Sequence, residues 1–180
     1  LVALVDDVAD RLPDLVVRDD RHLQVVAREQ IESRGRVAIV GESALHFEVI
    51  RNDTLGFKMG GRNGPKIEFA PLPLRLADGT GNHGMVVAHA ALTGRTINIA
   101  DAYDAGGYDF SGTRAFDART GYRSESFLTV PMKDHSGKVI GVLQLINAKD
   151  ERGHVRPFSN FDQQLVESLA SQAAIVLNNR

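Results

Sequence analysis

Short apolar runs that come in pairs, each pair joined by a tight polar turn, are the clearest feature of the sequence. Such runs are typical of strands, and a tight turn between two of them indicates an antiparallel hairpin. The last of these runs, residues 139–146, is apolar on both faces except at Gln144. This pattern is typical of a central strand that is covered on both sides. We therefore expect strands at 36–40, 44–50, 126–133 and 138–147.

Apolar residues that recur every three or four positions mark the predicted helices. The sequence predicts one helix over 1–12, one from Asp19 or Asp20 to near Gly35, one over 84–93 that ends at Gly94, and one over 161–179. The second has an apolar face of Leu23, Val26, Ala27 and Ile31, and the last has a stripe of Leu165, Leu169 and Val176. Ser159 and Asp162 have the spacing of a capping box in front of the last helix, with Phe158 as its hydrophobic staple.

The remaining segments are polar or interrupted by proline and glycine. Residues 52–64 predict a loop or a ragged hairpin turn, 67–76 an edge strand at best because of two prolines, and 96–100 a short strand. Residues 101–123 are polar and glycine-rich, and a loop of that length is typical of a lid or a binding loop. Because neighbouring strands are joined by tight turns, the order of elements predicts an antiparallel sheet in an α+β fold.

The composition is that of one globular domain, with 180 residues, 43% hydrophobic and 24% charged. Twenty-one basic against 23 acidic residues give a net charge of −2, which lacks the basic footprint of a nucleic-acid-binding protein. The longest uncharged run has 16 residues, fewer than the ~20 apolar residues of a membrane span. The chain has no cysteine, which excludes disulfides and thiolate chemistry and is compatible with the cytoplasm. It begins with Leu1 rather than Met, so we expect a segment of a longer protein.

Motifs for catalysis and cofactor binding receive little support. Residues 79–84 read G-x-G-x-x-G, with Asp101 at dinucleotide-site spacing, but the buried strand and the parallel βαβ unit of that site are absent from the pattern. The six histidines form no metal-ligand spacing, and only His83 and His89, beside the glycine loop, stay as candidates. Neither a nucleophile elbow nor a distinct pair of carboxylates is present. We therefore expect no enzyme activity.

Three segments together resemble the GAF domain, a sensory module of cyclic nucleotide phosphodiesterases, adenylyl cyclases and bacterial signalling proteins. They are Asn98 to Tyr103, Thr120 to Ser124 and Gly141 to Asn147, and the helix before Gly94 and the strand from Phe127 to Pro131 add to the likeness. The resemblance is dense from about Gly84 to Val176. It implies an antiparallel sheet of about six strands sandwiched between helices, over residues 35–180. Residues 1–34 are then expected to be N-terminal helices that serve as a linker or a dimerisation segment.

The cyclic-nucleotide-binding members carry a signature of Asn-Lys, then Phe, three residues and Asp-Glu. Asn147, Phe158 and Asp162 match it, but Ala148 stands where Lys is expected and Gln163 replaces Glu. The Lys–Asp ion pair of the signature is therefore missing at its usual position. We expect Lys149, one residue further on, to take the place of the lysine.

The resemblance also implies a ligand-binding set, which consists of Asn52, Asp53, Thr113, Arg114, Asp117, Thr120, Ser124 and Gln144. In this hypothesis Asp117 and Gln144 face the edge of a purine base. The phosphate lies on backbone N–H groups at a helix start, assisted by Arg114. The alternative is that Asp117 and Thr120 only cap a short helix.

Two functions of different classes follow. The first is a regulatory module that binds a cyclic nucleotide, cyclic AMP or cyclic GMP, and passes the signal to an output domain of the same polypeptide. The second is a dimerisation or scaffolding module without a ligand, and in both we expect a homodimer through the first or last helix. A free methionine sulfoxide reductase of this fold would need cysteines, which the chain lacks. Nucleic acids and membranes are not expected as partners.

Overall fold

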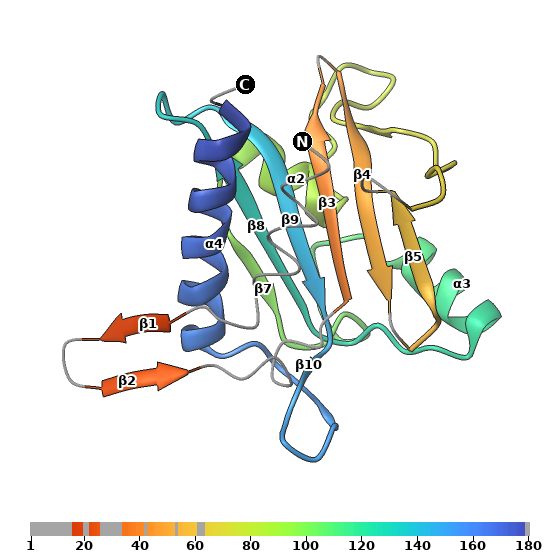
Figure 1. The fold of residues 1–180 in the computed structure, drawn as a ribbon. Helices are drawn as coiled ribbons and strands as arrows, with labels where there is room; N and C mark the ends of the chain where they lie inside the picture. Colours follow the sequence, from red (N-terminus) through yellow and green to blue (C-terminus); the bar gives the residue numbers. More distant parts are fainter. Residues whose placement is uncertain are drawn as a thin grey trace.

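A computed structural model describes residues 16–19, 22–25, 34–41, 43–52, 54–60 and 64–178 of the chain. The helix expected over 1–12 and the candidate residue Asp53 lie outside the described residues. The elements of the described part are arranged as an α+β fold, in which helices lie on both sides of one twisted sheet (Figure 1). This confirms the predicted fold class.

The central sheet contains seven antiparallel strands within the described residues, in the order β5-β4-β3-β9-β8-β7, with β6 paired to β4. The strands are β3 (Arg34–Val40), β4 (Ala44–Asn52), β5 (Phe57–Gly60), β6 (Leu72–Pro73), β7 (Ile97–Ile99), β8 (Phe127–Lys133) and β9 (Val139–Ile146). β9 lies between β3 and β8, which confirms the prediction of a central strand from its apolar run. The proline-containing segment contributes only the two residues of β6 at the edge, as expected.

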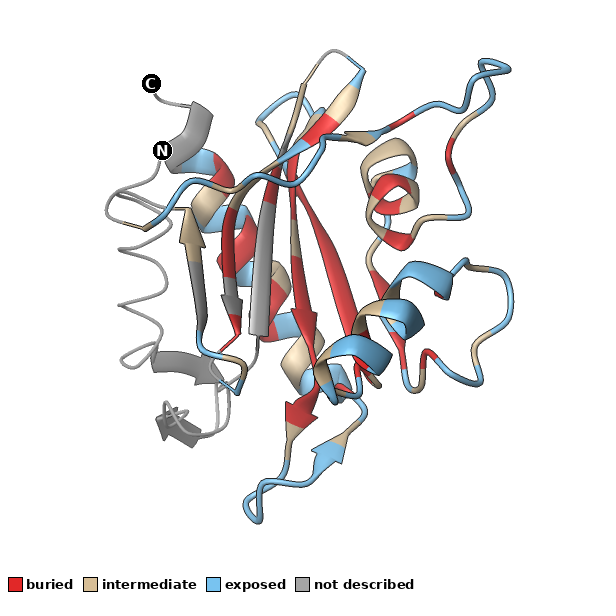
Figure 2. Cartoon of the chain, turned by 90° about the vertical axis from the view of Figure 1, so that its right-hand side faces the viewer, coloured by how far each residue is buried: buried red, intermediate tan, exposed pale blue. Residues whose placement is uncertain are grey.

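Each face of the sheet is covered by its own apolar cluster, because successive side chains of a strand point to opposite faces. Helix α2 (Val86–Thr93) packs on the face that carries Phe127, Val142 and Ile146. Helix α4 (Asn160–Asn178) packs on the opposite face. That second cluster contains Leu128, Val130, Met132 and Leu145 of the sheet, with Val166, Ala170 and Ala174 of the helix. The buried strands between two helical layers are visible in Figure 2.

Both predicted helix boundaries that depend on local chemistry are confirmed. Helix α2 ends at Gly94, which has a left-handed backbone (φ 63°) that glycine adopts without strain. Before α4, the N–H of Ser159 donates to Asp162 Oδ2 (2.7 Å), and the N–H of Asp162 donates to Ser159 Oγ (3.1 Å). This reciprocal pair is the predicted capping box, and Phe158 beside it is buried in the cluster under α4.

Two expectations from the sequence are wrong. Residues 101–123, expected to be irregular, contain helix α3 (Ser111–Thr120). The helix has no apolar stripe to mark it in the sequence; its anchor is Phe110, whose ring lies 5.3 Å from that of Phe127 on β8. Near the N-terminus, β1 (Val16–Asp19) and β2 (His22–Val25) pair as an antiparallel hairpin where a helix was expected to start. Valines at 16, 17 and 25 favour extended backbone there. The other residues of that predicted helix's apolar face, Val26, Ala27 and Ile31, lie outside the described part.

A second small hairpin connects the sheet to the last helix. β10 (Ala148–Lys149) pairs antiparallel with β11 (Val155–Arg156), so that Ala148 lies opposite Arg156 and Lys149 opposite Val155. Asp150 closes its turn by accepting hydrogen bonds from the N–H groups of Arg152 (2.9 Å) and His154 (2.8 Å). The chain thus passes directly from the central strand, through this hairpin, to the start of α4.

Candidate functional site

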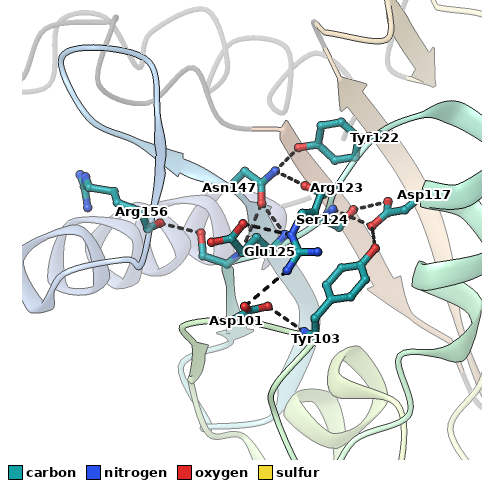
Figure 3. Close-up of polar contacts among 10 residues, drawn as sticks. Asp101, Tyr103, Asp117, Tyr122, Arg123, Ser124, Glu125, Asn147 and Arg156 are labelled. Carbon is teal, nitrogen blue, oxygen red and sulfur yellow. Dashed lines mark hydrogen bonds and ion pairs between the residues drawn. The ribbon is translucent and has the colours of Figure 1, made fainter.

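Asp117 of α3 is the centre of a buried polar cluster and is 3% exposed. Its Oδ2 accepts hydrogen bonds from the Tyr103 hydroxyl (2.7 Å) and from the N–H of Ser124 (2.6 Å), and its Oδ1 accepts from Ser124 Oγ (2.9 Å). Figure 3 shows these three side chains converging from the loop before α3, the helix itself and the segment after it. A buried carboxylate is stabilised by several donors of this kind, so Asp117 fixes the loop and the segment against the helix.

Tyr103 is held on its ring as well as at its hydroxyl. The guanidinium of Arg123 lies 4.0 Å from the centre of the ring, and it forms ion pairs with Asp101 (3.6 Å) and Glu125 (3.3 Å). The hydrogen bond to Asp117 raises the pKa of Tyr103 above its ordinary value, because the phenol must stay protonated to donate it. Tyr103 was absent from the set predicted from the sequence, and nothing in the local spacing connects it with a carboxylate 14 positions away.

Asn147 organises the segment that leads to Ser124. It is 2% exposed and has a left-handed backbone with φ 63°. Its Oδ1 accepts from the N–H groups of Glu125 (2.7 Å) and Ser126 (3.2 Å), while its Nδ2 donates to the carbonyl of Arg123 (2.7 Å) and to the Tyr122 hydroxyl. The asparagine of the signature therefore fixes the backbone of residues 123–126 and the hydroxyl of Tyr122. In the sequence it was marked by its match to that signature.

Gln144 lies on the sheet face that α2 covers. Its Nε2 donates to Oγ1 of Thr129 (2.9 Å), its cross-strand partner on β8, and both residues are buried. The next pair on the same face is Phe127 with Ile146, and Phe127 contacts Phe110 at the start of α3. The structure thus places Gln144 on a central strand, as the sequence predicted, one cross-strand pair from the residue that Phe110 contacts.

The other predicted residues have more varied positions. Thr113 and Arg114 lie in the first turn of α3, and Arg114 is exposed. Thr120 Oγ1 donates to the carbonyl of Phe116 within the helix (2.9 Å). Asn52, at the end of β4, accepts from the N–H of Leu55 (3.0 Å) and so closes a turn. Of the predicted set, the described contacts bring only Asp117 and Ser124 together directly. Neither Asp117 nor Thr120 caps α3, whose caps are Phe110 and Gly121, but the side chains of both form structural hydrogen bonds within the chain.

The ion pair of the signature is present, but with a different cation. Arg156 Nη1 lies 2.6 Å from Asp162 Oδ2, and Arg156 Nη2 donates to Oδ1 over 3.2 Å, which is a two-pronged contact. Lys149 was expected to supply this cation, and that expectation is wrong. Lys149 is the strand neighbour of Ala148, so its side chain points to the opposite face of the hairpin, and its carbonyl accepts from Arg156 Nε (3.2 Å).

Burial alone would raise the pKa of the Asp162 carboxyl, but hydrogen bonds from Arg156 and Ser159 outweigh burial and hold the pKa below its ordinary value. Correspondingly, the hydrogen bond to Asp162 raises the pKa of Arg156. The pair is therefore charged on both sides at neutral pH. Sequence reasoning missed Arg156, although the D-E-R-G turn after Lys149 predicts a hairpin that would bring it opposite Ala148.

The rings of the two candidate histidines, His83 and His89, pack edge to face. The ring centres of His83 and His89 are 5.0 Å apart, and His89 lies 5.5 Å from Tyr108, in both cases edge to face. Within the described ranges, no group of three or more His, Cys, Asp or Glu side chains is placed to hold a metal ion.

The family model for the GAF domain matches residues 36–177. The chain belongs to the GAF domain family. This GAF domain is 37% identical over 106 residues to a dual 3',5'-cyclic-AMP and -GMP phosphodiesterase 11 of Drosophila melanogaster, a match that covers 59% of this chain and 6% of the relative. It is 31% identical over 94 residues to dual 3',5'-cyclic-AMP and -GMP phosphodiesterase 11A of Takifugu rubripes, a match that covers 52% of this chain and 10% of the relative. The matched parts thus span at most a tenth of these relatives.

The fold is also that of a solved GAF domain/HD domain protein from Geobacter sulfurreducens. The two structures have a TM-score of 0.63 at 14% identity, and the likeness covers 99% of this chain and 92% of the other. At this identity the likeness shows the fold alone. In the described part of the GAF domain, no helix has both the length and the apolar character needed to cross a membrane.

Proposed function

We propose that this GAF domain is a sensory and regulatory module of a larger signalling protein and that it binds a cyclic nucleotide. The ligand would lie between the sheet face that carries Gln144 and the segment 101–124. The observation that supports the proposal is the polar cluster around the buried Asp117, which joins Tyr103 and Ser124, on either side of α3, to that helix. The names of the two phosphodiesterase relatives support the choice of ligand.

Each candidate residue has a role in this proposal that follows from its chemistry. Gln144 carries both a donor and an acceptor and approaches the purine edge from the sheet. Asp117 has acceptor capacity for about four hydrogen bonds and uses three in the cluster, so one remains for a donor on the base. Thr120 or Ser124 binds the polar rim of the ligand. The phosphate would lie at the first turn of α3, near Thr113 and Arg114, where backbone N–H groups favour an anion.

A melting scan tests the proposal with cyclic AMP, cyclic GMP and a free purine at millimolar concentration. A ligand at 100 times its dissociation constant stabilises the folded state by about 2.7 kcal/mol, which is several degrees of melting temperature for a domain of this size. We expect a shift with at least one cyclic nucleotide and a smaller one for Gln144→Ala. Gln164→Ala, at an exposed position of α4, is the matched control. No shift with any of these compounds in a folded sample would reject the nucleotide.

The alternative function is a dimerisation module without a ligand, and the exposed apolar residues of α4 favour it. Leu165 and Leu169, expected in the dimer face, are only 5% and 8% exposed and are buried within the chain; Val176 lies among the side chains that are not described. Phe161 and Ile175 are 44% and 62% exposed, and their spacing of 14 places them on one side of the helix. A homodimer through this side is expected in either function.

Sedimentation velocity at micromolar concentration measures the oligomeric state. We expect a dimer that Ile175→Glu converts to a monomer, whereas Ser171→Glu, also exposed, tests whether added charge alone is sufficient. A monomeric wild-type protein would reject the dimer. Together with an absent nucleotide shift, it would reject both functions.

A further inference from the structure

Arg156 has more polar contacts than a single ion pair requires. Its guanidinium binds both oxygens of Asp162 and also donates to the carbonyls of Lys149 (3.2 Å) and Pro157 (3.0 Å). The side chains of Arg156 and Asp162 are 32% and 18% exposed. Several bonds on one planar group fix its orientation as well as its position. The first turn of α4 is therefore attached to the hairpin β10–β11 in one geometry.

The backbone of Arg156 is attached to the opposite side, towards the candidate site. Ser126 Oγ donates to the carbonyl of Arg156 (2.8 Å) and accepts from the N–H of Ala148 (3.2 Å). Ser126 is fully buried, and its N–H donates to Asn147 Oδ1 (3.2 Å). Both strands of the hairpin thus meet at one hydroxyl, two residues from Ser124, which binds Asp117.

A connected series of residues therefore runs from the segment 101–124 to the last helix. It begins at Tyr103 and Asp117, continues to Ser124 and along the backbone to Ser126, and reaches the carbonyl of Arg156 (Figure 3). The side chain of Arg156 then binds Asp162. Asn98 of β7 adds a second attachment at the same helix start, where its Nδ2 donates to the carbonyl of Phe158 (3.1 Å). A change in the segment 101–124 therefore has a path to α4 that consists of hydrogen bonds and the backbone of residues 124–126 and does not pass through the apolar core.

We propose that Arg156 is a positioning residue that joins the start of α4 to residues 124–126 and, through them, to Asp117. The hairpin register explains why an arginine at this position is sufficient: Ala148 is the cross-strand partner of Arg156, so a cation on either strand lies on the same face of the hairpin. The role in passing a ligand signal to α4 rests on the proposed function. The attachment itself does not.

Hydrogen exchange followed by mass spectrometry tests the attachment without any ligand. In Arg156→Gln, we expect the amides of residues 124–126 and of the first turn of α4 to exchange about tenfold faster. Amides of β4, on the far side of the sheet, should keep their wild-type rates, because a general loss of stability would accelerate those as well. Lys149→Gln, on the other face of the same hairpin, is the matched control and should leave residues 124–126 unchanged.

Two rescue variants distinguish a positioning role of the charge at residue 156 from a simple packing role of its side chain. Arg156→Lys keeps the charge, and Ala148→Lys combined with Arg156→Gln moves the charge to the opposite strand. Recovery of slow exchange at residues 124–126 in either variant supports the proposal. Failure of both, or an effect of Arg156→Gln that is confined to α4 or spread evenly over the sheet, overturns it.

The ligand experiment distinguishes this inference from the proposed function. If cyclic AMP or cyclic GMP slows exchange in α4 of the wild type, Arg156→Gln should abolish that effect at saturating nucleotide. Unchanged protection of α4 in the variant overturns the inference and leaves the function intact. If no nucleotide binds but residues 124–126 still loosen in Arg156→Gln, the function fails and the attachment stands.

Discussion

Both faces of the sheet carry an apolar cluster, and they differ in the polar contacts that accompany it. On the α4 face, Leu128, Val130 and Met132 pack against Val166 and Ala170 in an apolar cluster. On the other face, the segment from Asp101 to Ser126 is anchored by Ala102 and Phe110 in the apolar cluster of that face and also by the hydrogen bonds of Asp117 and Asn147. Apolar packing is non-directional and stabilises broadly, whereas a polar cluster is specific and fails when one member is lost. Loss of one polar partner is therefore expected to loosen the segment 101–126 more than the rest of the fold.

The largest expected effect is on the apolar face. Leu128→Ala should destabilise the domain by about 2–5 kcal/mol, because the side chain is fully buried and leaves a cavity. Urea denaturation measures the loss. Leu76→Ala, at a position that is 49% exposed, is the control and should change the free energy of unfolding by less than about 0.5 kcal/mol. Equal losses of stability in both variants would contradict the conclusion that buried apolar packing stabilises the α4 face.

Asn147 should come next in magnitude. Asn147→Ala removes the acceptor of two backbone N–H groups and leaves a non-glycine residue at φ 63°, which together should cost about 2–4 kcal/mol. Asn147→Gly removes the same bonds but relieves the backbone, so it should be about 1 kcal/mol more stable than the alanine variant. The same urea titration compares them. An alanine variant as stable as the glycine variant would show that the left-handed backbone at position 147 does not destabilise the alanine variant.

Asp117→Ala should cost about 1–3 kcal/mol, because it leaves the buried N–H and hydroxyl of Ser124 without their acceptor. Its local effect should be larger than its global one, with faster hydrogen exchange in residues 101–124 than in β8 and β9. Asp104→Ala, in the same loop but exposed, serves as the control. Uniform acceleration across the sheet would mean that the polar cluster supports the whole fold.

The smallest expected effect depends on pH. The folded pKa of Asp162 lies below its ordinary value, so its contribution is present above the unfolded pKa of about 3.9 and is lost as the pH falls through the folded pKa. Because Asp162 and Arg156 are partly exposed, the contribution should be under about 1 kcal/mol. The free energy of unfolding of the wild type and of Asp162→Asn, measured by urea denaturation at several pH values, isolates this contribution as the difference between the two proteins. A difference in free energy that does not change between pH 5 and 3 would contradict the lowered pKa of Asp162.

The sheet could be predicted because its signals are local. The run Val139–Ile146 is apolar on both faces, and only a strand covered on both sides accommodates that pattern. Helix α2 was marked by its terminal Gly94, and α4 by the capping pair Ser159 and Asp162. These signals depend on residues within one or two turns of each other.

The missed features depend on contacts between distant residues. Helix α3 has no apolar stripe and is fixed by Phe110 against Phe127 and by Asp117 with Tyr103. For the site, the positions of Asp117, Ser124 and Gln144 followed from the resemblance to the family, but their hydrogen-bond partners did not. The cation of the Asp162 pair was misassigned to Lys149, because the answer depends on which residues face each other across a two-residue hairpin.

The tip of that hairpin offers a place to modify the protein. Residues 150–154 are exposed and project from the body of the domain (the blue hairpin at the foot of Figure 1). Exposed turns of this kind accept insertions, and an insertion between Glu151 and Arg152 would leave the opposed positions 148 and 156 in register. A circularly permuted fluorescent protein placed there would be joined to the two strands that connect the central sheet with the last helix. Its emission would then report any relative movement of the two.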